Sequence, residues 1–158
     1  MEYQGIDGFL GSRASLAYDV AFLLELAVIP LCVWSLELLL IRRRYLAHKR
    51  LQLFITAIFA VAVAVFTLEF FAYDWQVRAA GASIPGITYM TLTIHLAFLV
   101  ITTAMWAMLL VQALRKIPSP PEPCDFGPYY IFGLVLVCLQ LFISTLTGWE
   151  FYLLAFCY

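Results

Sequence analysis

Four long hydrophobic stretches dominate the chain, and its charged residues gather mainly between them. The stretches cover residues 15–40, 50–73, 87–114 and 129–156. An α-helix needs roughly 20 apolar residues to cross a hydrocarbon core about 30 Å thick, and each stretch is long enough. The connections between successive stretches are short enough for neighbouring helices to lie antiparallel. The pattern predicts an all-α, integral membrane protein with a single domain, residues 1–158, folded as an up-down-up-down bundle of four transmembrane helices.

Composition supports a membrane protein, and the placement of the basic residues predicts its orientation. Of 158 residues, 65% are hydrophobic and 12% are charged, whereas soluble domains are nearer one half and one quarter. The predicted inner connections contain Arg42, Arg43, Arg44, Lys49, Arg50, Arg115 and Lys116, and only Arg13 and Arg78 lie on the other side. Basic loops stay in the cytoplasm. We therefore expect a multi-pass protein of the bacterial inner (cytoplasmic) membrane with both termini on the outer, periplasmic side.

The basic loop "RRRYLAHKR", residues 42–50, is interpreted as a topology signal that can also bind anionic lipid. Nucleic acid is not an expected partner. We expect His48, within the same loop, to be solvated.

Aromatic residues at helix ends fit a second membrane signature. Tyr73 and Trp75 follow the second hydrophobic stretch, and Trp149 and Tyr152 lie near the end of the fourth. Trp and Tyr are enriched where a membrane meets water, so these four residues are expected to form an interfacial belt.

Ionisable residues inside spans are rare and mark candidate functional sites. At a rise of about 1.5 Å per residue, Asp19 and Glu69 lie roughly 6 Å from the outer ends of their helices, His95 roughly 12 Å and Glu25 roughly 15 Å. Glu37 lies at the cytoplasmic end, beside the basic loop, which can neutralise it. The outer half of the bundle is therefore the expected place of a polar site.

Helical phase predicts which faces point inward. At about 100° per residue, two polar stripes emerge, one in the third stretch and one in the fourth: Thr88, Thr91, His95, Thr102 and Trp106, and Gln140, Ser144, Thr147 and Gly148. Small and hydroxyl residues let membrane helices approach closely and form hydrogen bonds. Both stripes, and His95 with them, are expected to face the bundle interior.

Two interpretations of His95 remain open from the residues alone. A neutral imidazole can hold two helices together by a hydrogen bond to a threonine or a carboxylate across the bundle. Alternatively, His95 joins Asp19 and Glu69 in a cluster that binds a metal or handles protons, since imidazole and carboxylates together suit copper and zinc. A haem with His95 as its single axial ligand is a further option. Sequence motifs of hydrolases and phosphate-binding enzymes are absent, so a non-enzymatic role is expected.

Four segments resemble a known family. They are "GFLGSRASLAYDV", "RRRYLAHKRLQ", "ITYMTLTIHLAFL" and "TLTGWEFYLLAF", and together they extend over nearly the whole chain. The chain resembles the small four-helix bacterial membrane proteins, catalogued as a domain of unknown function, that include the CtaM-like cytochrome oxidase assembly factors. The polar positions that match are Asp19, His48, Glu69, Tyr89, His95, Thr147 and Gly148.

The resemblance implies a small membrane protein that assists the assembly or function of a haem–copper respiratory oxidase by contacting its membrane subunits. It also implies a further histidine near the start of the fourth helix, where this chain has Phe126, Tyr129 and Tyr130. A member without that histidine could instead be a structural accessory subunit of a larger membrane complex. The third possibility is a redox protein that binds haem or quinone near His95.

Overall fold

The computed structural model describes residues 5–73, 75–116 and 128–158 of the chain. Within these ranges the protein is helical: α1 spans Leu16–Leu40, α2 Tyr45–Ala72, α3 Trp75–Ala79, α4 Pro85–Lys116 and α5 Pro128–Tyr152, followed by the π-helical turn η1, Leu153–Cys157. Four helices are long and apolar enough to cross a membrane. The prediction of an all-α protein with four long apolar helices is confirmed for the described residues.

The connection between α1 and α2 is shorter than the sequence indicated, because α2 begins at Tyr45 and not near residue 50. Arg43 adopts a positive φ of 51°, and the Arg44 amide donates to the Leu38 carbonyl at 2.8 Å. This tight turn leaves only residues 41–44 outside the helices. His48 and its basic neighbours up to residue 50 therefore lie on the first turns of α2 and not in a loop.

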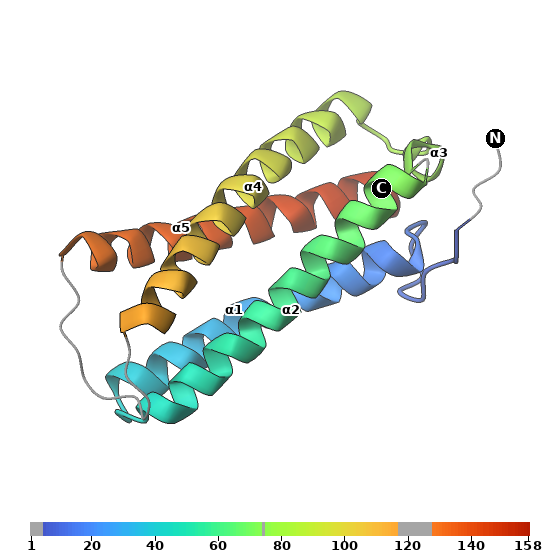
Figure 1. The fold of residues 1–158 in the computed structure, drawn as a ribbon. Coiled ribbons are helices and arrows are strands. Elements are labelled where there is room, and N and C mark those ends of the chain that lie inside the picture. Colours follow the sequence, from blue (N-terminus) through green and yellow to red (C-terminus); the bar gives the residue numbers. More distant parts are fainter. Residues whose placement is uncertain (1–4, 74, 117–127) are drawn as a thin grey trace.

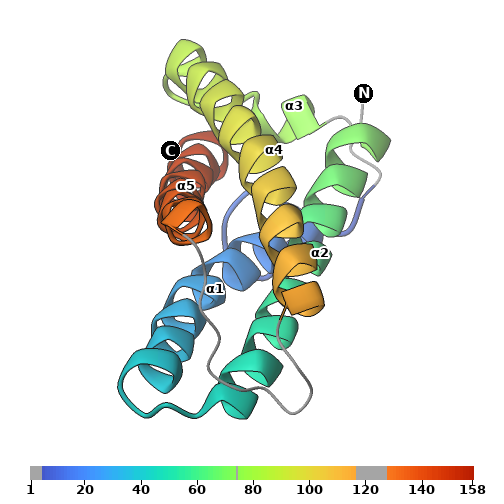
Figure 2. The same ribbon diagram turned by 60° about the vertical axis from the view of Figure 1, so that its left-hand side comes forward.

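The helices pack mainly as two pairs, α1 with α2 and α4 with α5 (Figures 1 and 2). Aromatic side chains join one pair to the other. Phe59 of α2 stacks on Trp106 of α4 with ring centroids 5.6 Å apart, and the Trp106 Nε1–H donates to Thr56 Oγ1 at 3.0 Å. Further along α2, Phe66 forms a T-shaped pair with the His95 ring, with ring centroids 5.5 Å apart.

An aromatic core fills the end of the molecule where η1 and α3 meet. Trp75 is only 5% exposed and packs against Phe70 and Phe151. Tyr152 is also buried. The expectation of an interfacial belt was wrong for these two residues, because the chain after α2 folds back onto the bundle and carries Trp75 into it. Tyr73 does remain exposed.

Candidate functional site

The two polar stripes face the interior, as their helical phase predicted. Thr88, Thr91, His95 and Thr102 of α4 are each at most 3% exposed. On α5, Ser144 is buried, whereas Gln140, Thr147 and Gly148 are half-buried. The stripe on α4 is therefore a line of buried hydroxyls and one imidazole within an otherwise apolar helix.

His95 is held in one orientation by the neighbouring helix. Its Nδ1 lies 3.0 Å from the backbone carbonyl of Ser144. A carbonyl oxygen can only accept, so Nδ1 carries the hydrogen and the Nε2 of the neutral ring is left as an acceptor. The same Ser144 carbonyl accepts from the Thr147 hydroxyl at 3.0 Å. His95 thus forms an interhelical hydrogen bond, but its partner is a backbone carbonyl and not the threonine or carboxylate that the sequence suggested.

Glu25 of α1 is the carboxylate that approaches His95. Both side chains border the small space in front of Gly148: a methyl group at that glycine would lie 2.7 Å from Glu25 Oε2 and 2.9 Å from His95 Cε1. The three residues line one cavity with Tyr18, Ala21, Phe22, Phe66, Phe151 and Tyr152. Glycine at 148 is what lets the carboxylate and the imidazole come so close.

Asp19 lies at a different place and has a different role. Its carboxylate is fully buried. One oxygen accepts from the amides of Phe9 and Leu10 at 2.6 and 2.8 Å, and the other accepts from the Tyr152 hydroxyl. These donors compensate the burial of a charged group. Asp19 therefore fixes the segment before α1 against the last turn of α5.

The segment before α1 is folded onto the end of the chain. Gly11 takes a φ of +76°, which glycine adopts at little cost. The Arg13 amide then donates to the Phe156 carbonyl at 3.1 Å. Arg78, which follows α2, donates to the Arg13 carbonyl and pairs with Asp7 at 2.6 Å. Both ends of the described chain and the α3 region are thereby tied into one structure, which we call the terminal cap (residues 5–15, α3 and η1).

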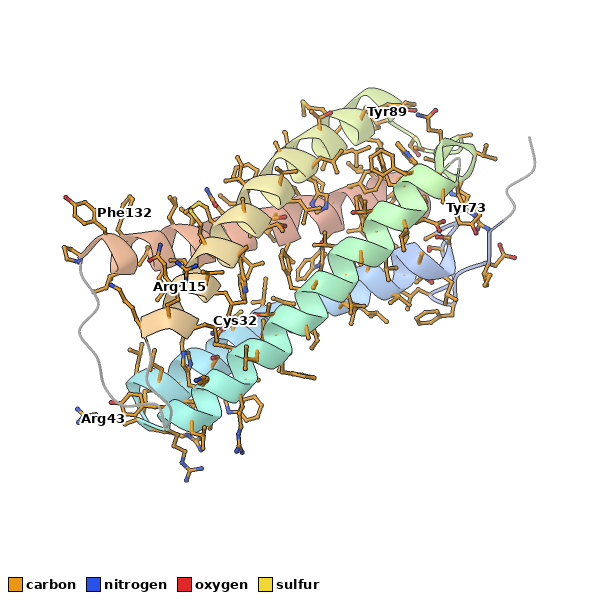
Figure 3. All side chains as sticks on the ribbon, viewed as in Figure 1. Cys32, Arg43, Tyr73, Tyr89, Arg115 and Phe132 are labelled. Carbon is orange, nitrogen blue, oxygen red and sulfur yellow. The ribbon has the colours of Figure 1, made fainter. Side chains whose placement is uncertain are left out.

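The remaining predicted residues are dispersed. Glu69 is 5% exposed in the last turn of α2, and Tyr89 is 46% exposed at the start of α4. Tyr73 and Tyr89 lie toward the same end of the molecule (Figure 3). The resemblance implied a histidine near the start of α5, where this chain has other residues. Of these, Phe126 lies outside the described residues and Tyr129 is exposed.

A metal site does not form from these groups. In the described part of the chain, no three or more His, Cys, Asp or Glu side chains are placed to hold a metal ion. Asp19, Glu69 and His95 therefore do not make the metal-binding set that their similar depth suggested, because the oxygens of Asp19 are already occupied by amides and by Tyr152. The space beside His95, about 20 Å³, does not fit a haem.

The opposite end of the α1–α2 pair has its own polar contacts. His48 Nδ1 lies 2.8 Å from Ser35 Oγ and 2.9 Å from the Ser35 carbonyl, and the Gln52 amide donates to the same hydroxyl at 3.0 Å. His48 is half-buried, so the expectation of a solvated histidine was wrong. Glu37 pairs with Arg42 at 2.8 Å, as the sequence indicated.

Sequence reasoning missed that Glu25 is the neighbour of His95, and that Tyr152 is the partner of Asp19. Depth from the outer helix ends could have suggested the first pair, since Glu25 and His95 differ in depth by only about two helical residues. The second pair depends on the fold of residues 5–15, which helical periodicity does not describe.

Comparisons with known proteins give no further assignment. No family model matches the chain, and no curated protein or solved structure matches it significantly.

Proposed function

We propose that this chain is a non-enzymatic, multi-pass membrane protein that assists the assembly or function of a haem–copper respiratory oxidase by contacting the membrane subunits of that enzyme. The proposal rests on the four segments that resemble the CtaM-like family. One structural observation supports it: residues of the first and last of these segments meet, Asp19 with Tyr152, and residues of the last two meet, His95 with Gly148. The segments that carry the resemblance therefore contact one another in the fold and are not scattered over it.

The proposed topology is an up-down-up-down bundle in the bacterial inner membrane with both termini in the periplasm. The terminal cap then lies at the periplasmic face. Arg43, between α1 and α2, and Arg115, in the last turn of α4, lie toward the end away from Tyr73 and Tyr89 (Figure 3). A basic cluster at that end favours its placement in the cytoplasm.

The exposed surface supports a role in contact with lipid and with other membrane proteins. Large hydrophobic side chains are exposed on all four long helices, among them Trp34, Phe54, Val100 and Phe132. Such a surface is stable only against acyl chains or against the helices of a partner.

The experiment is a chromosomal deletion combined with purification of the tagged protein from its native membrane. We expect the deletion to lower the amount of spectrally mature haem–copper oxidase, and the tagged protein to co-purify with oxidase subunits before maturation and to leave afterwards. Normal amounts of mature oxidase in the deletion strain would refute the proposal.

The second candidate is a permanent accessory subunit of a larger membrane complex. The hydrogen bond from His95 to Ser144 favours it, because that contact needs no cofactor to explain the histidine. A subunit would remain with its complex in fixed proportion after maturation. A visible haem spectrum or a bound quinone in the purified protein, lost on His95→Ala, would instead support a redox role.

A further inference from the structure

A small, partly open cavity is lined by both Glu25 and His95 in the half of the bundle nearest the terminal cap. Its volume is about 20 Å³, and roughly 10–15 Å³ of such volume is enough for one water molecule. Aromatic rings of Phe22, Phe66 and Phe151 form much of its wall. The cavity is thus the size of a single water and is polar at only a few points.

Two residues that line this cavity, His95 and Glu25, each have a polar atom that forms no hydrogen bond with a described residue. His95 is 1% exposed, and after Nδ1 has bonded to Ser144 no described residue bonds to its Nε2. Glu25 is half-buried, and within the described ranges no hydrogen bond or ion pair reaches its carboxyl group. Neither of these two groups is fully enclosed, so a water molecule can reach each of them and bond to both.

The other titratable groups near the cavity interact elsewhere. Tyr18 and Tyr152 also line it. Tyr18 has an interaction of its own, and the Tyr152 hydroxyl already donates to Asp19 and contacts Ser12 Oγ at 2.7 Å. The Asp19 carboxylate is occupied by its amide donors. Glu69 is buried one helical turn beyond Phe66. Glu25 and His95 are therefore the pair that a small ligand would join.

We propose that Glu25 and His95 bind one water molecule between them and share a single proton through it. The carboxyl group and Nε2 are the two ends of the bridge, and the water passes the proton from one to the other. With one proton between them the pair has no net charge, whether the proton is on the carboxyl group or on the imidazole. A neutral pair suits an apolar membrane interior, where an unbalanced charge is costly. This inference is independent of the oxidase proposal.

The test is ¹⁵N NMR of the full-length protein, labelled at histidine, in lipid nanodiscs at neutral pH. The chain contains two histidines, and His48→Gln assigns the signals. We expect the Nε2 signal of His95 to lie between those of a free neutral imidazole and an imidazolium, and to receive magnetisation from water. Glu25→Gln should move it to the free neutral position. Gly148→Ala, which puts a methyl group into the cavity, should do the same and abolish the transfer from water.

Two matched variants control for general effects. Glu150→Gln removes an exposed carboxyl group two residues after Gly148. Gly133→Ala adds a methyl group to the same helix at an ordinary distance of 3.5 Å from Leu109 Cδ2. Both should leave the His95 signal unchanged. A wild-type Nε2 signal at the free neutral position, or one that Glu25→Gln does not change, would overturn the proposal even if Gly148→Ala failed to fold.

Discussion

The hydroxyl of Tyr152 in α5 donates a hydrogen bond to the carboxylate of Asp19 in α1, across 133 positions of sequence. The same carboxylate holds the amides of Phe9 and Leu10. Asp19 therefore connects the segment before α1, the first long helix and the last one. This explains an acidic residue inside a membrane span without a catalytic or metal-binding role.

Tyr152→Phe should destabilise the protein by about 1.5–3 kcal/mol, the range for hydrogen bonds to charged groups, because the ring is kept and only the hydroxyl is lost. Thermal unfolding in a mild detergent measures the change. Tyr129→Phe is the matched control, since Tyr129 lies on the same helix and is 90% exposed. Equal stability of the two variants would contradict a structural role for the bond to Asp19.

Gly8→Ala should detach the segment before α1 from the bundle. A methyl group at this position would lie 2.7 Å from the Ala14 carbonyl and would also meet the Asp19 carboxylate. Hydrogen exchange at the amides of Phe9 and Leu10, which Asp19 now protects, should accelerate at least tenfold. That factor corresponds to a loss of about 1.4 kcal/mol in local stability.

Gly86→Ala is the control for this variant, because a methyl group at Gly86 would meet no atom within 4 Å. Its exchange pattern should match that of the wild type. Unchanged protection of Phe9 and Leu10 in Gly8→Ala would show that the cap tolerates the methyl group and that glycine is not needed there.

Helical periodicity predicted the long helices and their inward faces well. The inward position of His95 follows from its phase relative to Thr88, Thr91 and Thr102, because side chains on one stripe of a helix share one environment. The same method could not find the contacts of Trp75 or Tyr152. Those depend on how residues outside the long helices fold back, and a hydrophobic pattern contains no information about that path.

That Glu25 lies beside His95 could be predicted only in part. Depth placed Glu25 near His95, but α1 could have presented Glu25 to lipid or to another helix. The decisive feature is Gly148, whose missing side chain opens the space that the two groups share. The stripe of polar and small residues on α5 indicated close helix packing. It did not show which carboxylate would lie beside Gly148.

The hydrogen bond from Trp106 to Thr56 should contribute about 1 kcal/mol to the link between the two helix pairs, the usual net contribution of one hydrogen bond, and Trp106→Phe should cost at least that much. The substitution keeps an aromatic ring beside Phe59 but replaces the indole by a smaller ring, and with it removes the Nε1–H that donates to Thr56. A double-mutant cycle with Thr56→Val, measured by thermal unfolding, isolates the bond. Trp34→Phe is the control, because Trp34 is 50% exposed. If the effects of Trp106→Phe and Thr56→Val on stability were additive, the bond would contribute nothing.

The proposed orientation can be tested by thiol labelling in intact cells. Gly86→Cys lies at the start of α4, near the terminal cap, and Arg50→Cys lies near the start of α2 at the basic end. In a background without the four native cysteines, a membrane-impermeant maleimide added outside should label Gly86→Cys at once. Arg50→Cys should be labelled only after the cells are permeabilised, because seven of the nine basic residues favour a cytoplasmic position for that end. The opposite pattern would invert the topology and place the terminal cap, with its Asp19–Tyr152 bond, at the cytoplasmic face.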